Sequence, residues 1–182
     1  HNYIEQIFSL ESVGCKDWLT NKVDRCVGGK VAKQQCVGEL QLPLNNCGVM
    51  ALDYSTKHGV ATSIGHSPVS ALIDPNAGSK NSIAEALTNI IWAPIENGLK
   101  GVSLSANWMW PCKNEGEDAR LYKAVESVSK FAIELGINIP TGKDSLSMNQ
   151  KYENLEVKSP GTVIVSATAH CNNISNILEP VF

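Results

Sequence analysis

Short stretches of apolar residues, bounded by turn-forming residues, predict several β-strands in this chain. The strongest are 47–55 and 60–68, which lie on either side of the turn-forming TKHG and are expected to pair antiparallel. The other predicted strands are 30–44, which has Pro43 near its end, 101–108, the short 137–140 and 160–170. The polar segment 149–159 resembles a hairpin.

Two longer stretches have the spacing of amphipathic helices. Residues 74–94 begin with Asp74 as N-cap and a proline in the first turn, and Pro94 is expected to end the helix. Its predicted core face is Ile83, Ala86, Leu87, Ile90 and Ile91. Residues 117–136 predict a second helix, with Gly136 as the left-handed residue at its C-terminal end.

The order of these elements predicts an α+β fold, with helices on one face of a largely antiparallel sheet. The other face needs cover, so we expect the sheet to pair with another domain or with a second copy through a large apolar patch. Residues 1–23 are interpreted as a lead-in and 24–182 as one domain. The chain starts without Met and ends at ILEPVF, which suggests a piece of a longer polypeptide.

Composition narrows the range of partners and locations. The apolar content is 43% and the net charge is −3, so neither nucleic acid nor an anionic membrane is expected as a partner. No apolar run approaches the roughly 20 residues of a membrane span. The six cysteines form no C-x-x-C pair, and we interpret them as reduced thiols of a cytoplasmic protein.

The segment PTGKDSLSM, at 140–148, superficially resembles a phosphate-binding P-loop. Five residues rather than four separate Gly136 from Gly142, and an aspartate follows Lys143 where a P-loop has Ser or Thr. A helix rather than a strand is predicted before it. The P-loop interpretation therefore fails.

A possible metal site lies on the polar face of the first predicted helix. This face is expected to carry Ser82, Glu85, Thr88 and Asn89, and residues four apart are neighbours on a helix. Glu85 and Asn89 would offer a carboxylate and an amide oxygen to one point, as Mg²⁺ prefers. The alternative is an ordinary solvated helix face.

The predicted loop 141–147 and one strand end supply further polar groups. Lys143 can meet a phosphate as a point charge. Asp144 can hold a metal or orient a hydroxyl, and the Ser145 hydroxyl can donate to a phosphate oxygen. A plain surface loop is the alternative. Asn107 lies near the end of the strand 101–108 and is a candidate to line a cleft. No catalytic nucleophile with its base can be argued.

Four segments together resemble a known family. They are 24–44, 59–90, 104–122 and 140–148, in one order along most of the chain. They are similar to the synthetase part of the large form of phosphoribosylformylglycinamidine synthase, an aminoimidazole ribonucleotide synthetase-like family, and most similar to the N-terminal domain of its second half. The resemblance implies sheet-to-sheet pairing between two such domains.

The resemblance also implies a function. The family converts formylglycinamide ribonucleotide, glutamine and ATP to formylglycinamidine ribonucleotide in purine biosynthesis, as an ATP-dependent C–N ligase. The expected partners are the first synthetase half, a C-terminal domain and a glutaminase. The expected cofactors are Mg²⁺ and ATP or ADP, and this domain by itself is expected not to turn over substrate.

The family pattern assigns site residues by position. Glu85 and Asn89 match two metal ligands of an auxiliary nucleotide site, and Asn46 falls where the family has an aspartate. Asn45 matches a nucleotide contact. The amide at Asn46 carries less charge than a carboxylate, so metal binding there is expected to be weaker or differently arranged.

Two alternatives stay open. The domain can be a purely structural module that a bound nucleotide staples, or a stand-alone relative such as a small-molecule kinase or a selenophosphate-type synthetase.

Overall fold

A computed structural model of the chain describes residues 2–16, 19 and 29–180. The expected domain boundary at 23/24 lies outside these residues, and so do Cys26 and the start of the first family-like segment. Helix α1 (Asn2–Phe8) has no buried residue. In the part of the chain that the structure describes, no helix is both long and apolar enough to cross a membrane.

Six strands form the main sheet, in the order β1-β2-β3-β8-β4-β5. Neighbouring strands pair antiparallel except β4 and β5, which are parallel. The strands are β1 (Val31–Lys33), β2 (Cys47–Ala51), β3 (Gly59–His66), β4 (Val102–Met109), β5 (Asn138–Ser145) and β8 (Thr162–Cys171). The predicted hairpin at 149–159 is confirmed as the separate pair β6 (Asn149–Lys151) and β7 (Glu156–Lys158).

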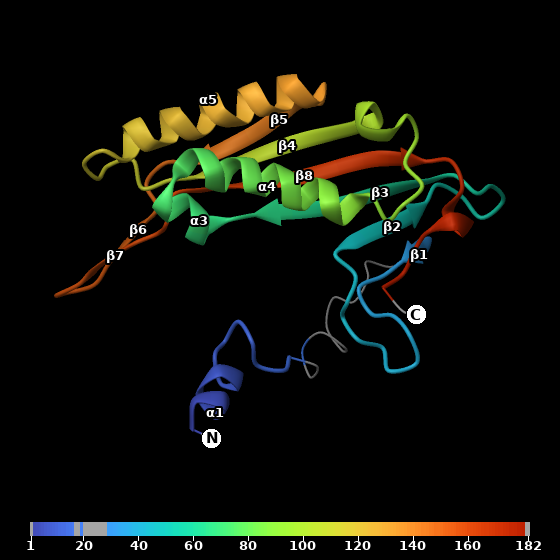
Figure 1. The fold of residues 1–182 in the computed structure, drawn as a ribbon, viewed down its shortest axis with the longest axis horizontal. Helices are drawn as coiled ribbons and strands as arrows, with labels where there is room; N and C mark the ends of the chain where they lie inside the picture. The colour runs from blue at the N-terminus through green and yellow to red at the C-terminus, as the bar shows by residue number, and fades with distance from the viewer. Residues whose placement is uncertain (1, 17–18, 20–28, 181–182) are drawn as a thin grey trace.

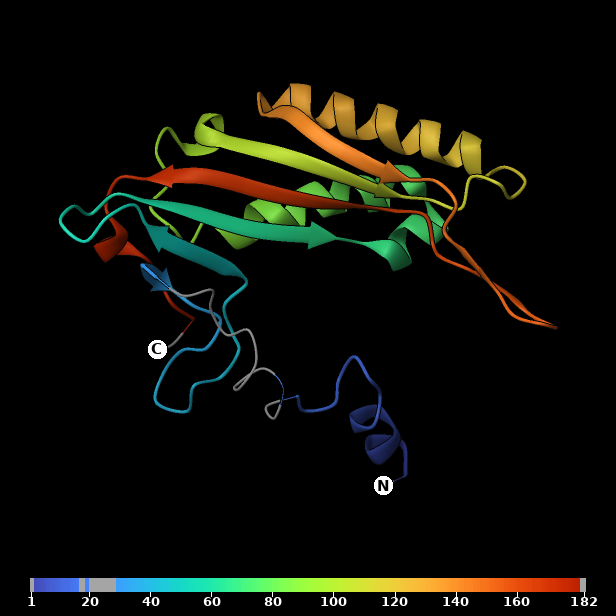
Figure 2. The same ribbon diagram turned by 180° about the vertical axis from the view of Figure 1, so that it is seen from behind.

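Helices α4 (Pro75–Ile90) and α5 (Glu117–Leu135) lie on the same face of the sheet, as Figures 1 and 2 show from opposite sides. The predicted α+β fold is therefore confirmed. The core lies between these layers, and its fully buried residues include Ile83, Ile90, Leu104, Val163 and Val165. Gly136 ends α5 with a φ of 68°, as expected for a left-handed cap.

Helix α4 differs from its prediction in where it ends and in which residues its buried and exposed faces carry. Asp74 caps it as expected, accepting from the Asn76 N–H at 2.9 Å, but the helix ends at Ile90 rather than at Pro94. Proline disfavours helical geometry in the residue before it, so the chain turns earlier. Ile91 is consequently 52% exposed, and Ser82, expected on the polar face, is 1% exposed.

Three other elements also differ. The strand expected over 30–44 covers only Val31–Lys33, and the rest is an irregular loop. A short helix, α3 (Pro68–Ile73), follows β3 and is too short to show a helical period in the sequence. The short strand at 137–140 extends through Ser145, so Lys143, Asp144 and Ser145 lie in β5 and not in a loop. Short 3₁₀ turns, η1 (Gly98–Gly101) and η2 (Ile174–Asn176), complete the fold.

The face of the sheet opposite α4 and α5 carries polar and apolar residues. Thr62 of β3 lies across from Thr168 of β8, which pairs in turn with Ser103 of β4. Ile64 lies across from Ser166 in the next row. The face is mixed, because Met50, Val60 and Ile164 also lie on it, and its pairing with another sheet stays a prediction.

Candidate functional site

Strand β3 and helix α4 approach each other closely where the predicted metal ligands lie. The Ser63 hydroxyl donates to the Ala86 carbonyl at 2.6 Å in the buried layer between them. Gly65 permits this approach, since a Cβ there would lie 2.2 Å from the Ser82 carbonyl oxygen. The strand and the helix therefore form a rigid base for the side chains at their shared edge.

Glu85 and Asn89 are each oriented by the end of β3. The His66 N–H donates to Oε2 of Glu85 at 2.6 Å, and Nδ2 of Asn89 donates to the Ile64 carbonyl at 3.0 Å. These bonds use one oxygen of the carboxylate and the nitrogen of the amide. Oε1 of Glu85 and Oδ1 of Asn89 are thus the atoms left for a ligand.

Asn45 and Asn46 approach from the irregular segment before β2. Asn45 is 8% exposed, and its Nδ2 donates to the Gln34 carbonyl at 2.7 Å. Its Oδ1 is buried, and none of the described residues donates a hydrogen bond to it. Asn46 is exposed, since alternate residues of an extended segment point to opposite sides.

Two adjoining cavities lie around these side chains. The first, of about 430 Å³, and the second, of about 680 Å³, share Asn45, Asn46, Cys47 and Asn89 in their walls. Glu85 lines the second cavity together with residues of the sheet face opposite the helices. The structure therefore brings together four of the predicted site residues, from two separate parts of the sequence.

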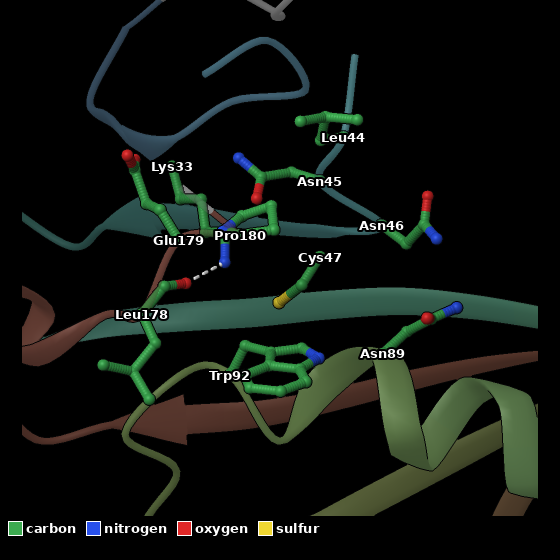
Figure 3. A pocket seen from close by; sticks show the side chains of 10 residues that line it. All are labelled: Lys33, Leu44, Asn45, Asn46, Cys47, Asn89, Trp92, Leu178, Glu179 and Pro180. Carbon is green, nitrogen blue, oxygen red and sulfur yellow. Dashed lines mark hydrogen bonds between the residues drawn. The ribbon is translucent and has the colours of Figure 1, made fainter. Parts of the chain in front are cut away.

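Sequence reasoning missed most of the wall of the first cavity. Figure 3 shows Lys33 and Asn45 on one side of it and the Trp92 indole on the other. Leu178 joins the two sides, because its N–H donates to the Trp92 carbonyl at 2.9 Å and its carbonyl accepts from Nζ of Lys33 at 2.5 Å. Lys33 lies in the family-like segment 24–44 but had no predicted role, and Trp92 and Leu178 lie outside all four segments, so the fold alone brings these three residues together.

Burial changes the ionisation of two groups at this wall. It lowers the pKa of Lys33, which is 4% exposed. It also raises the pKa of the Cys47 thiol to about 11, and the nearby Lys33 opposes this only in part. Cys47 is therefore a neutral thiol at physiological pH.

Lys143, Asp144 and Ser145 lie at the opposite edge of the sheet. They belong to β5, and β8 and β4 separate that strand from β3. The described residues that line the two cavities do not include them. Asn107 of β4 is the register partner of Lys143, and its buried Oδ1 has no hydrogen-bond partner among the described residues.

The side chains that gather where β3 meets α4 have the chemistry that a magnesium ion requires. Glu85, Asn89 and Asn46 offer one carboxylate and two amide oxygens, the hard oxygen donors that Mg²⁺ prefers. Within the described ranges, no group of three His, Cys, Asp or Glu side chains forms a metal cluster. A magnesium ion held here would therefore need further oxygen ligands from phosphate and water.

The family model and the relatives that match this chain all point to the same enzyme family. The family model for the FGAR-AT PurM_N-like domain matches residues 15–170. A probable phosphoribosylformylglycinamidine synthase of Caenorhabditis elegans is 46% identical over 97% of the chain, and the Homo sapiens phosphoribosylformylglycinamidine synthase is 43% identical over 99%. The chain spans 13% of the length of each of these two relatives.

Solved structures support the same fold. The PurLQS structure from Thermotoga maritima has a TM-score of 0.66 at 16% identity, over 91% of this chain and 25% of that one. The T. maritima PurL complexed with ADP has a TM-score of 0.63 at 16% identity, over 94% of this chain and 25% of that one. The family model covers most of the sequence, and the chain therefore belongs to the FGAR-AT PurM_N-like domain family.

Proposed function

We propose that this chain is a domain of a phosphoribosylformylglycinamidine synthase, an ATP-dependent C–N ligase of purine biosynthesis, and that it holds a magnesium–nucleotide complex. The whole enzyme would convert formylglycinamide ribonucleotide, glutamine and ATP to formylglycinamidine ribonucleotide. One observation carries the nucleotide site: Glu85, Asn89, Asn45 and Asn46 meet around two adjoining cavities. The synthases that match 97% or more of the chain support the enzyme class.

Each residue has a distinct role in this proposal. Glu85 supplies the negative charge at the metal position, and the His66 N–H fixes its orientation. Asn89 and Asn46 add neutral oxygens. Magnesium, when bound, would neutralise part of the phosphate charge. The second cavity, next to Glu85, suits the phosphates, and the first, with Trp92 and Leu44 in its wall, suits the base.

A nucleotide role for Lys143, Asp144 and Ser145 stays a prediction. Their strand lies at the far edge of the sheet, away from the two cavities. They would therefore have to contact a ligand other than the nucleotide beside Glu85, or a ligand that another domain holds. Lys143 is exposed and shares its row of the sheet face opposite the helices with Asn107.

A structural role is the second candidate, and Asn46 favours it. An asparagine in place of an aspartate reduces the charge at the metal and therefore its affinity. The domain would then complete the paired-sheet core of the enzyme while the nucleotide acts as a staple. Nucleotide-free enzyme with normal synthesis rates would support this role over a catalytic one.

The proposal predicts that the chain binds ADP only with magnesium. Calorimetry should detect binding in the presence of Mg²⁺, and EDTA should abolish it. Glu85→Ala should weaken Mg–ADP binding by tenfold or more, because it removes the only carboxylate of the set. Thr88→Ala, one helical turn further on the same exposed side, is the matched control and should bind normally. Equal affinity in Glu85→Ala and the unmodified chain would contradict the assignment.

A further inference from the structure

The segment that follows β8 forms one side of the first cavity. Three consecutive residues of this segment line the cavity, and we call them the strap: Leu178, Glu179 and Pro180. Figure 3 shows them on the side away from Asn46 and Asn89. The chain just before the strap is anchored, since Ile174 and Ile177 pack against the core. The strap therefore extends from a fixed point.

Two hydrogen bonds hold the strap in the described part of the chain. The Leu178 N–H donates to the Trp92 carbonyl at 2.9 Å, and the Leu178 carbonyl accepts from Nζ of Lys33, as Figure 3 shows. These bonds connect the strap to the turn after helix α4 on one side and to strand β1 on the other. Leu178 is 60% exposed, so apolar burial adds little. A segment held in this way can open without unfolding the rest of the domain.

Lys33 and the strap stabilise each other. Lys33 is only 4% exposed, and a buried amine needs an acceptor. The Leu178 carbonyl provides one, and the nearby Glu179 carboxylate adds an attraction between opposite charges. Opening of the strap would take both partners away from the amine, which is unfavourable for a buried donor. Lys33 therefore favours the closed arrangement of the strap.

We propose that Lys33 is a positioning residue that keeps the strap closed beside a nucleotide bound in the first cavity. It acts through the strap and does not have to touch the ligand. A nucleotide that contacts the closed strap stabilises it, so binding and closure favour each other. Loss of the Lys33 amine would reduce the closed fraction of the free chain and, with it, the apparent affinity. This inference rests on the proposed nucleotide site and adds a moving wall to it.

The Leu178 amide proton reports closure, because its bond to the Trp92 carbonyl exists only while the strap is closed. In the full chain, Mg–ADP should slow hydrogen exchange of this amide about tenfold or more, as measured by NMR. Lys33→Met should speed the exchange by about tenfold, the change that one lost hydrogen bond supports. The Ile174 amide is the internal control, since it donates to the Lys57 carbonyl at 2.8 Å outside the strap. Its exchange should change less than about twofold in both experiments.

Two further variants separate positioning from a general loss of structure. Lys33→Arg keeps a charged donor and should retain slow Leu178 exchange and Mg–ADP affinity. Lys30→Met is the matched control, since Nζ of Lys30 also donates to a backbone carbonyl, that of Leu52 at 2.6 Å, which lies outside the strap. Calorimetry should find about tenfold weaker Mg–ADP binding in Lys33→Met and unchanged binding in Lys30→Met. The effect of Mg–ADP on the unmodified chain needs no variant to fold.

The outcomes distinguish the strap from the nucleotide site. Mg–ADP binding that leaves Leu178 exchange unchanged would overturn the role of the strap and leave the proposed function intact. Equal Leu178 exchange in Lys33→Met and in the unmodified chain would overturn the role of Lys33. Absence of Mg–ADP binding to the unmodified chain would overturn the proposed function and this inference with it.

Discussion

Asp53 illustrates how a single carboxylate organises the turn between β2 and β3. It follows strand β2, and its Oδ1 accepts from the Thr56 N–H at 2.6 Å and from the Ser55 N–H at 2.8 Å, while its Oδ2 accepts from the Thr56 hydroxyl. These bonds lower the pKa of Asp53 to about 2, the Thr56 N–H contributing most. The turn holds β2 and β3 in register, and both strands lead to cavity walls.

The first prediction concerns this carboxyl. Its folded pKa lies below the value of about 3.9 for an unfolded chain. Its contribution to stability is thus fully present above about pH 4 and is lost as the pH falls toward 2. An NMR titration of the Asp53 carboxyl carbon should give a midpoint near 2, and Thr56→Val should raise it. A midpoint near 3.9 in the folded protein would contradict the hydrogen-bonded turn.

At the scale of elements, the contact between β3 and α4 decides the geometry of the proposed metal ligands, Glu85 and Asn89. Their helical spacing in the sequence was enough to place Glu85 and Asn89 on one side of α4, because the period of a helix is regular. The orientation of each side chain was not predictable from the sequence. It depends on His66 and Ile64, backbone groups of a strand about twenty residues away in sequence.

Other site residues show the same limit. Asn45 and Asn46 were found only through the family pattern, since asparagines before a strand usually indicate a turn. Lys33 and Trp92 gave no local signal and meet only through the Leu178 segment. Lys143 was misplaced, because GKDS resembles a loop and yet forms part of an edge strand, where exposed polar residues are well tolerated.

Gly65→Ala is the prediction at this scale. The added Cβ would meet the Ser82 carbonyl oxygen at 2.2 Å and the Ala86 nitrogen at 2.4 Å, both backbone atoms that cannot move without shifting α4. We expect a loss of about 1–3 kcal/mol in the free energy of unfolding and weaker Mg–ADP binding. Urea unfolding and calorimetry would measure the two effects.

A second glycine variant serves as the stability control for this experiment. At Gly48 of β2, an added Cβ would meet only the Thr62 hydroxyl, at 3.6 Å. Gly48→Ala should therefore change the free energy of unfolding by no more than about 0.5 kcal/mol. Similar losses in the two variants would mean that close packing of β3 on α4 is not what sets stability here.

At the scale of the whole molecule, one sheet face lacks helices. It carries serine and threonine beside apolar residues such as Ile64. Among the described residues, two buried oxygens on β4 and β8, Oδ1 of Asn107 and Oγ1 of Thr162, have no hydrogen-bond partner. Such atoms are stabilised when a second polar sheet packs over them. We therefore infer that this face is the surface that pairs with another domain of the same polypeptide.

This surface leads to a prediction for the isolated chain. With no other domain present, two copies should pair through the same face as the concentration rises, and light scattering after size exclusion would detect a dimer. Ile64 is 56% exposed at the centre of the face, so Ile64→Lys should restore the monomer. Val69→Lys, on α3 and 73% exposed, is the control. A dimer that persists in Ile64→Lys would place the contact elsewhere.

The position of β8 in the sheet has a consequence for synthesis in the cell. This strand lies between β3 and β4, and its partners in β3 precede it by about a hundred residues, a separation that slows folding. While the chain leaves the ribosome, β3 and β4 are made first and their inner edges stay open until Cys171 has emerged. Open strand edges are prone to aggregate, so a nascent domain of this kind depends on protection until its last central strand is complete.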